Sequence, residues 1–324
     1  MQTRFLKLNW LKEALLQEFR GGQAMSEIVI IGSMNMDFVI NCDRLPEPGE
    51  TLTGRSFARH SGGKGANQAA AAGLLGARPL FIGARGADEI GQSLEDNLNR
   101  QGVETELITA NTETGTAHIF VTDDGENHII VIPGANGTLK NGDIRSLATE
   151  IQEAKILLLQ LEIPLEAVME AARIAAEAGT TVILDPAPAQ ELPDELLSRV
   201  DYLLPNETEL EMLSGSAEIE VGCSQLLARG VKNLIVTLGG NGALMVNAEG
   251  EKIFSAPEVE VVDTTAAGDA LAGAFAAALN KGLGPEEAVI EGIYYGSAAV
   301  SRPGAQSSLF TRDEFSEFLS SRSE

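Results

Sequence analysis

The chain has 324 residues, of which 44% are hydrophobic and 22% charged, a composition typical of a globular protein and not of a disordered or fibrous one. Its 23 basic and 47 acidic residues give a net charge of −24, which repels nucleic acid phosphates and anionic lipid headgroups. We therefore expect no nucleic acid partner and no membrane partner, and no apolar run reaches the roughly 18 residues that a membrane-spanning helix needs. Cys42 and Cys223 form neither a disulfide framework nor a metal-spaced cluster, which favours a reducing, cytoplasmic compartment.

Residues 5–16 have the pattern of an amphipathic helix, with Lys and Glu inside the apolar run and no signal-peptide cleavage site. Gly21-Gly22 and Met25 follow, and the first strand pattern begins only at Ile28. We predict that Met25 is the functional start, that residues 1–24 are a dispensable extension, and that residues 25–324 form one α/β domain.

Short apolar runs then alternate with stretches of helical periodicity. This pattern predicts βα units that build a doubly wound, mostly parallel sheet flanked by helices. The predicted strands are 28–31, 80–83, 156–159, 182–184, 202–204 and 234–236, and the predicted helices between them include 67–75, 89–101, 165–178 and 207–213.

Two segments, about 38–59 and 113–134, carry alternating or polar-flanked strands instead, and residues 116–132 have the pattern of a β-hairpin. Because these few strands cannot form a core of their own, they must pack on the domain, on a second subunit, or on both. They are either a small β-sheet lid that doubles as a dimer contact or an edge hairpin without such a role.

The segment after the first strand lacks the glycines of a dinucleotide-binding motif, since Met34 and Asp37 occupy two of the required positions. A nicotinamide enzyme is therefore disfavoured. Asn35 and Asp37 either hold ligand hydroxyls at the carboxyl edge of the sheet or serve as turn residues.

The segment 61–68 has the glycines of a phosphate-binding loop, but Ala58 and Gly65 break the Walker A template. Consecutive glycines let the backbone approach a small polar ligand, and Lys64 and Asn67 add hydrogen-bond donors. The alternative is a glycine-rich turn with a solvated lysine.

The segment 263–269 places small residues ahead of a helix, which leaves backbone N–H groups free to bind a phosphoryl group. Asp269 in its first turn either caps the helix or stands beside the anion as a general base. Weaker glycine or capping patterns at 238–242 and 205–209 end two other strands, where nucleotides commonly bind. His60, His118 and His128 show no metal-ligand spacing.

Together these motifs resemble those of the ribokinase-like family of sugar kinases (B-type phosphofructokinases), from about Ile28 to Phe310 and most specifically at 62–69 and 263–269. The resemblance implies ATP-dependent phosphorylation of the O5 hydroxyl of D-ribose, giving D-ribose 5-phosphate and ADP. Asp269 would be the base, and the N–H groups of Ala266, Ala267 and Gly268 would form the anion hole.

The resemblance also implies which residues surround each ligand. Those for the sugar are Asn35, Asp37, Gly62, Gly63, Lys64, Asn67, Glu162 and Asp269, and those for ATP are Asn206, Thr237, Gly239, Gly242, Gly268 and Ile293. Glu209 would act on Mg²⁺ through its water shell. A potassium ion would be held by Asp263, Thr265, Ala299, Arg302, Gly304 and Ser308, and a homodimer would form through the β lid.

Two alternatives stay open. One is a kinase of the same family for 2-deoxyribose or another small sugar or nucleoside, because pockets separate neighbouring sugars by few hydrogen bonds. The polar set Asn35, Asp37, Lys64 and Asn67 favours a sugar without a base. The other is a non-catalytic sugar-sensing protein, which the intact Gly268-Asp269 pair disfavours because a sensor needs no base.

Overall fold

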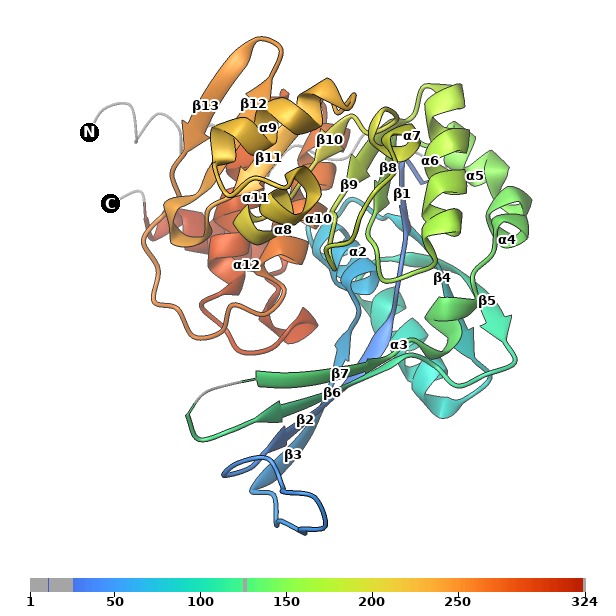
Figure 1. The fold of residues 1–324 in the computed structure, drawn as a ribbon, viewed down its shortest axis with the longest axis vertical. Coiled ribbons are helices and arrows are strands. Elements are labelled where there is room, and N and C mark those ends of the chain that lie inside the picture. Colours follow the sequence, from blue (N-terminus) through green and yellow to red (C-terminus); the bar gives the residue numbers. More distant parts are fainter. Residues whose placement is uncertain (1–10, 12–25, 125–126, 323–324) are drawn as a thin grey trace.

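A large β-sheet forms the centre of the computed structural model, which describes residues 11, 26–124 and 127–322. In this part of the chain nine strands follow the order β13-β12-β11-β10-β9-β8-β1-β4-β5 (Figure 1). Their bounds are β1 (Ile28–Ile31), β4 (Leu80–Gly86), β5 (Glu104–Ala110), β8 (Ile156–Leu159), β9 (Thr181–Leu184), β10 (Tyr202–Leu203), β11 (Asn233–Thr237), β12 (Ala243–Asn247) and β13 (Gly250–Phe254). The strands from β5 to β11 pair in parallel, and β12 and β13 add an antiparallel hairpin, so the prediction of a mostly parallel sheet is confirmed.

Helices cover both faces of this sheet, which makes the fold doubly wound as predicted. The helices are α2 (Lys64–Leu74), α3 (Glu89–Arg100), α4 (Asn141–Ser146), α5 (Ala148–Glu153), α6 (Leu165–Ala178), α7 (Asp194–Leu197), α8 (Glu207–Ser214), α9 (Ile219–Ala228), α10 (Ala267–Asn280), α11 (Pro285–Ala299) and α12 (Arg312–Ser320), with short 3₁₀ turns η1 (Gly134–Thr138), η2 (Gly239–Asn241) and η3 (Gln306–Ser308). Ile28 and Ile30 of β1 pack with α2, α3 and α10–α12, whereas Val29 and Ile31 pack with α4–α9. Because both faces are buried, the central strands are continuous apolar runs.

Three strands of this sheet are not among the predicted ones. β5 lies at one edge and begins Glu104-Thr105-Glu106, so it lacks the apolar run that marks the buried strands. β12 and β13 form the other edge, and β13 is largely exposed. The outermost strands β5 and β13 need only one buried face, and their sequences are correspondingly polar, whereas β12 is a short apolar run that the strand prediction passed over.

A second sheet, here called the β lid, consists of β2 (Asn35–Asn41), β3 (Ser56–Gly62), β6 (Thr116–Val121) and β7 (Asn127–Ile132) in the order β3-β2-β6-β7. It projects from the body of the molecule (Figure 1). β6 and β7 pair antiparallel, which confirms the predicted hairpin. β2 begins at Asn35, three residues before the predicted lid segment, so Asn35 and Asp37 are lid residues and not part of a loop after β1.

Leu11 is the only described residue among the first 25, and it is fully buried in the core that contains α10–α12. The rest of the predicted N-terminal helix and the expected start at Met25 lie outside the described residues. In the part of the chain that the structure covers, no helix has the length and apolar character needed to cross a membrane.

Candidate active site

The loop before α10 lines a pocket of about 220 Å³. The N-cap residue of α10, Ala266, has a left-handed backbone with φ 58°, a strained conformation for a residue with a Cβ atom. Within the described ranges, the N–H groups of Ala266 and Gly268 have no hydrogen-bond partner, and that of Ala267 donates to the Thr264 carbonyl oxygen at 3.3 Å. Free N–H groups and the helix dipole together favour an anion here. The pocket is lined by Lys64, Asp185, Leu204, Asn206, Glu209, Thr237, Thr264, Ala266, Ala267, Gly268, Asp269, Leu271 and Ala272.

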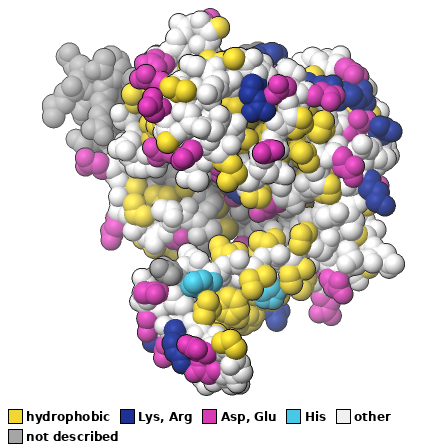
Figure 2. All heavy atoms as spheres, in the orientation of Figure 1, with side chains coloured by type: hydrophobic (Ala, Val, Ile, Leu, Met, Phe, Trp, Pro, Cys, Tyr) yellow, Lys and Arg dark blue, Asp and Glu magenta, His cyan; other side chains and the backbone are white. Residues whose placement is uncertain are grey.

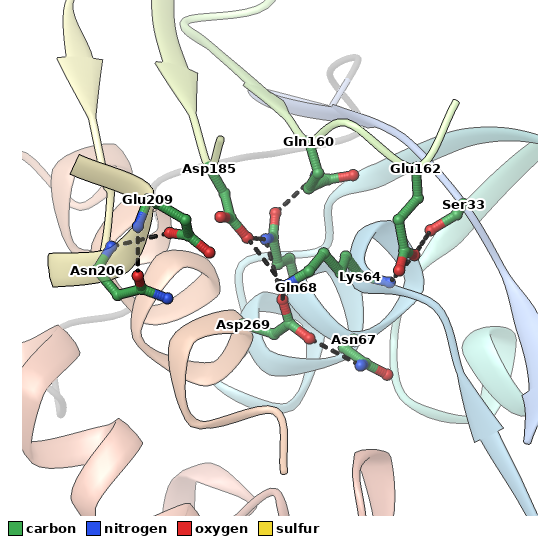
Figure 3. Close-up of polar contacts among 10 residues, drawn as sticks. All are labelled: Ser33, Lys64, Asn67, Gln68, Gln160, Glu162, Asp185, Asn206, Glu209 and Asp269. Atoms are coloured by element: carbon green, nitrogen blue, oxygen red, sulfur yellow. Dashed lines mark hydrogen bonds and ion pairs between the residues drawn. The ribbon is translucent and has the colours of Figure 1, made fainter. Parts of the chain in front are cut away.

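Asp269 lies in the first turn of α10 and is only 4% exposed. Its Oδ2 accepts a hydrogen bond from Asn67 Nδ2 at 2.8 Å, and its Oδ1 accepts one from Gln68 Nε2 at 3.3 Å (Figure 3). α10 has no side-chain cap, so the alternative in which Asp269 caps the helix is wrong. The carboxylate lines the pocket beside the free N–H groups, as a general base for an attacking hydroxyl requires.

Lys64, at the start of α2, places its ammonium group between two buried carboxylates. Its Nζ lies 3.6 Å from Asp185 Oδ2 and 3.5 Å from Asp269 Oδ1. Burial lowers the pKa of Lys64, but the charges of Asp185, Asp269 and Glu162 outweigh burial and raise it, so the side chain stays cationic. Burial raises the pKa of Asp185, and the Lys64 charge opposes that rise. The lysine is therefore part of the site and not a solvated turn residue.

The sugar-side candidates meet where the β lid joins the body. Glu162 Oε2 accepts hydrogen bonds from Ser33 Oγ at 2.5 Å and from the Lys64 backbone N–H at 3.0 Å. Asn35 Oδ1 accepts one from Asn136 Nδ2 at 2.8 Å, which leaves the Asn35 amide nitrogen for a ligand. Burial, followed by the charges of Glu162 and Asp269, raises the pKa of Asp37 to about 7.

Two glycines of the 62–65 segment are required by close contacts. A Cβ atom on Gly62 would stand 2.1 Å from Asp37 Oδ2. Gly63 has φ 89°, and a Cβ atom there would lie 2.7 Å from the Met34 Cα. These glycines let the Asp37 carboxylate and the chain after β1 approach α2.

The nucleotide-side candidates lie at the ends of β10 and β11. Asn206 caps α8, and Glu209 Oε2 accepts a hydrogen bond from the Asn206 N–H at 2.8 Å in a capping box. Asn206 also pairs with Thr237, and all three residues line the pocket.

Three other nucleotide candidates do not line this pocket. Gly239 has open space around its Cα, whereas a Cβ atom on Gly242 would lie 1.9 Å from the Phe254 carbonyl oxygen, so Gly242 has a structural reason to be glycine. Ile293 is buried in the core on α11.

The potassium candidates lie on two loops that Asp263 ties together. Its Oδ1 accepts hydrogen bonds from the Thr265 N–H and hydroxyl, and its Oδ2 accepts one from the Gly304 N–H at 2.8 Å. Burial opposes ionisation, but these hydrogen bonds outweigh it and lower the pKa of Asp263.

The carbonyl oxygens of these loops differ in whether they already accept a hydrogen bond. Those of Thr265, Arg302 and Gly304 have no donor in the part of the chain described, which suits a hard cation, and that of Ala299 accepts from the Arg302 N–H. The Ser308 hydroxyl is already used, since it donates to the Ala305 carbonyl oxygen at 2.7 Å.

Sequence reasoning gave no site role to five polar residues that hold the site together, namely Ser33, Gln68, Asn136, Gln160 and Asp185. Gln160 and Asp185 follow β8 and β9 directly, and the carboxyl ends of parallel strands are where such sheets bind ligands. That position is a signal that could have found these two. Asn136, more than 100 residues from Asn35, had no such signal.

Comparison with known proteins assigns the chain to a family. The model of the pfkB family of carbohydrate kinases matches residues 25–312. The chain is 40% identical to a ribokinase of Haemophilus influenzae over 302 residues, which cover 90% of this chain and 98% of that protein. It is 35% identical to a deoxyribokinase of Salmonella typhi, over 91% of this chain and 99% of that protein. The structure of Arabidopsis thaliana ribokinase complexed with ribose and ATP superposes with a TM-score of 0.84 at 33% identity, over 91% of this chain and 99% of that one.

Proposed function

The chain belongs to the pfkB family of carbohydrate kinases, and we propose that it transfers the γ-phosphoryl group of ATP to the O5 hydroxyl of D-ribose, giving D-ribose 5-phosphate and ADP. One observation carries the proposal. The buried Asp269 carboxylate stands in the same first helical turn as the free Gly268 N–H, in a pocket that is also lined by Lys64 from the sugar-side set and by Asn206 and Thr237 from the nucleotide-side set.

The transfer follows from this arrangement. The Asp269 carboxylate takes the proton of the O5 hydroxyl as that oxygen forms a bond to the γ-phosphorus. The bond from the γ-phosphorus to the bridging oxygen breaks, and ADP leaves. The N–H groups of Ala266, Ala267 and Gly268 stabilise the charge on the transferred group, which is the larger part of catalysis in phosphoryl transfer. Lys64, held cationic beside Asp269, adds positive charge at the same point.

Sugar recognition rests on a donor and acceptor set that suits hydroxyl groups. Asn35 offers its amide nitrogen, and Asp37 and Glu162 offer carboxylate oxygens. Asn67 Oδ1 is a buried acceptor without a partner among the described residues, so a ligand hydroxyl would satisfy it. Gly62 and Gly63 bring the backbone close to the same space.

ATP would bind along Asn206, Thr237, Gly239, Gly242 and Gly268, with Ile293 behind the adenine. Magnesium fits near Glu209, whose charge acts on both Lys64 and Asp185, and when bound it neutralises phosphate charge. Potassium fits the oxygen-rich loops around Asp263, with Thr265, Ala299, Arg302, Gly304 and Ser308 as its candidate partners. Its charge would steady the loop that precedes the anion hole.

The test is ADP release with magnesium-ATP against ribose, 2-deoxyribose, fructose, adenosine and pseudouridine, each with potassium or with a bulky organic cation. Turnover on ribose that rises with potassium supports the proposal. Turnover on 2-deoxyribose and not on ribose would identify 2-deoxyribose as the substrate, an outcome given weight by the deoxyribokinase relative. Ribose-induced thermal stabilisation without any turnover would favour a sugar sensor.

The Asp269→Asn variant separates base catalysis from binding. It keeps the size of the side chain and its contact with Asn67, so the affinity for ribose and ATP should persist. Turnover should fall about 10²-fold or more, the usual contribution of a general base. Unchanged turnover would remove Asp269 from the mechanism.

We also propose that two chains associate through the β lid. Phe57, Ile129, Ile130, Val131 and Ile132 are each 48–59% exposed, and Figure 2 shows hydrophobic side chains gathered on the lid. Such a patch is typical of an interface. Ile130→Glu should convert a dimer to a monomer in sedimentation velocity, with Ile253→Glu, at a somewhat more exposed isoleucine of β13, as the control.

Two further expectations belong to this proposal. Residues 25–324 would form the kinase domain, located in the cytoplasm, where the buried thiols of Cys42 and Cys223 stay reduced. Deleting residues 1–24 should leave turnover and melting temperature unchanged. Because Leu11 is buried in the core, a lower melting temperature of the deletion variant would show that the extension is structural.

A further inference from the structure

We propose that Gln68 and Gln160 form a buried amide relay that positions the Asp269 carboxylate for proton transfer, an inference that rests on the base role given to Asp269 above. Both side chains are completely buried. Gln160 follows β8 and Gln68 lies in α2, so the relay links the central sheet to the helix that carries Lys64 and Asn67 (Figure 3). Neither glutamine is among the residues assigned to a ligand.

The hydrogen bonds of the relay run in one direction. Gln160 Nε2 donates to Gln68 Oε1 at 2.6 Å, and Gln68 Nε2 donates to Asp185 Oδ2 at 2.8 Å and to Asp269 Oδ1 at 3.3 Å. Ionised carboxylates only accept hydrogen bonds, so the Gln68 amide nitrogen has to face them. Its carbonyl oxygen then needs a donor on the opposite side, which Gln160 supplies.

This direction fixes the plane of the Asp269 carboxylate. Gln68 holds Oδ1 and Asn67 holds Oδ2, so both oxygens have a donor and rotation of the carboxylate would break both bonds. Gln68 also bridges Asp269 to Asp185, the same two oxygens between which Lys64 Nζ lies. A reversed Gln68 amide would instead turn its carbonyl oxygen toward two carboxylates and repel them.

Two glycines make room for the end of the Gln160 side chain. A Cβ atom on Gly32 would lie 1.9 Å from Gln160 Oε1, and one on Gly65 would lie 2.9 Å from it. Gln160 Oε1 has no partner among the described residues, and a buried unpartnered acceptor is unfavourable. An apolar side chain of similar length would avoid that penalty, so the bond that Gln160 donates to Gln68 is what the amide contributes.

Gln160→Glu and Gln160→Met test the relay in the full-length enzyme with ribose and magnesium-ATP. A protonated carboxyl group can donate to Gln68 as the amide does, whereas the ionised carboxylate can only accept and so reverses the Gln68 amide. The kcat of Gln160→Glu should therefore fall about 30-fold as pH rises through the pKa of the introduced carboxyl group, since small misplacements of a catalytic group reduce rates steeply. The kcat of Gln160→Met should be about 5-fold lower than that of the wild type at every pH.

The outcomes separate positioning from packing. If the glutamines only fill space, both variants lower the melting temperature but keep the wild-type pH profile per folded enzyme, and this result overturns the relay. The KM for ribose should change little in either variant, because Asp269 is the one sugar-side candidate to which the two glutamine side chains hydrogen-bond in the described part of the chain.

A second pair of variants keeps the inference testable if Gln160→Glu does not fold. Gln68→Met should lower kcat by about 30-fold, and adding Gln160→Met to it should lower kcat no further, because Gln160 acts through Gln68. Independent, multiplying losses would overturn the relay. A wild-type enzyme without turnover on any sugar of the panel would instead refute the proposed function, so the two failures are distinguishable.

Discussion

The Asp37 carboxyl group offers a quantitative test of the electrostatics on the sugar side. Burial, then the charges of Glu162 and Asp269, raise its pKa from 3.8 to about 7. A carboxyl group whose pKa is raised by folding binds its proton more tightly in the folded state, so the fold loses stability as pH rises from the unfolded pKa to the folded pKa. The rise of about 3 pH units corresponds to about 4 kcal/mol at 1.36 kcal/mol per unit. This destabilisation is complete above pH 7 and disappears as pH falls toward 4.

Asp37→Asn removes the charge and keeps the shape. We expect the free energy of unfolding in urea to rise by about 4 kcal/mol at pH 8 and by only about 2 kcal/mol at pH 5.5, where the wild-type carboxyl group is already largely protonated in the folded state. Asp96→Asn, on the exposed part of α3, is the matched control and should change stability by less than about 0.5 kcal/mol at both pH values. An equal gain at both pH values, or a loss, would refute the reasoning. The variant should also bind ribose more weakly, because the Asp37 carboxylate lowers stability but provides an acceptor for the sugar hydroxyls.

Three further variants probe other parts of the site. Lys64→Met leaves Asp185 and Asp269 buried without their cation, so the free energy of unfolding in urea should fall by about 3 kcal/mol at pH 8, and by less at pH 5.5 as Asp185 gains a proton; a loss independent of pH would contradict this. Gly62→Ala should raise the KM for ribose about 10-fold or more, because the new methyl group displaces the Asp37 carboxylate, whereas Gly142→Ala, with open space around it, should leave KM unchanged. Ala266→Gly relieves the left-handed strain, so stability should rise by about 0.5 kcal/mol while kcat falls several-fold through loosening of the anion hole; kcat and stability that rise together would argue against a strained, preorganised loop.

Much of the fold could be predicted because its signals are local. β1, β8 and β9 are buried on both faces, so each is a short continuous apolar run that stands out in the sequence. The glycines at 62–63 and the small residues before Asp269 are local as well, because the backbone geometry they permit is formed within a few residues. The family resemblance then supplied roles that these segments alone left open.

The contacts inside the site could not be predicted in the same way. Gln68 meets Asp269 across 201 positions and Gln160 across 92, so both contacts depend on how α2 packs against α10 and against the residue that follows β8. Helical periodicity marks Gln68 only as a residue on the buried face of α2, a place where glutamine is unexpected. A glutamine on an apolar helix face signals that it has a buried partner, but it does not say which residue that partner is.

The position of the β lid relative to the body bears directly on catalysis. Asn35 and Asp37 lie within β2, whereas Asp269 lies on α10, so these two sugar-side residues and the base belong to different parts of the structure, and Lys64 and Asn67 lie on α2 in the body. The two parts meet where β3 ends at Gly62 and α2 begins at Lys64, whose side chain reaches Asp269. A movement of the lid would therefore shift Asn35 and Asp37 relative to the base. Because β2 follows β1 and β3 leads directly into α2, such a movement would be transmitted through the backbone connections between the lid and the body.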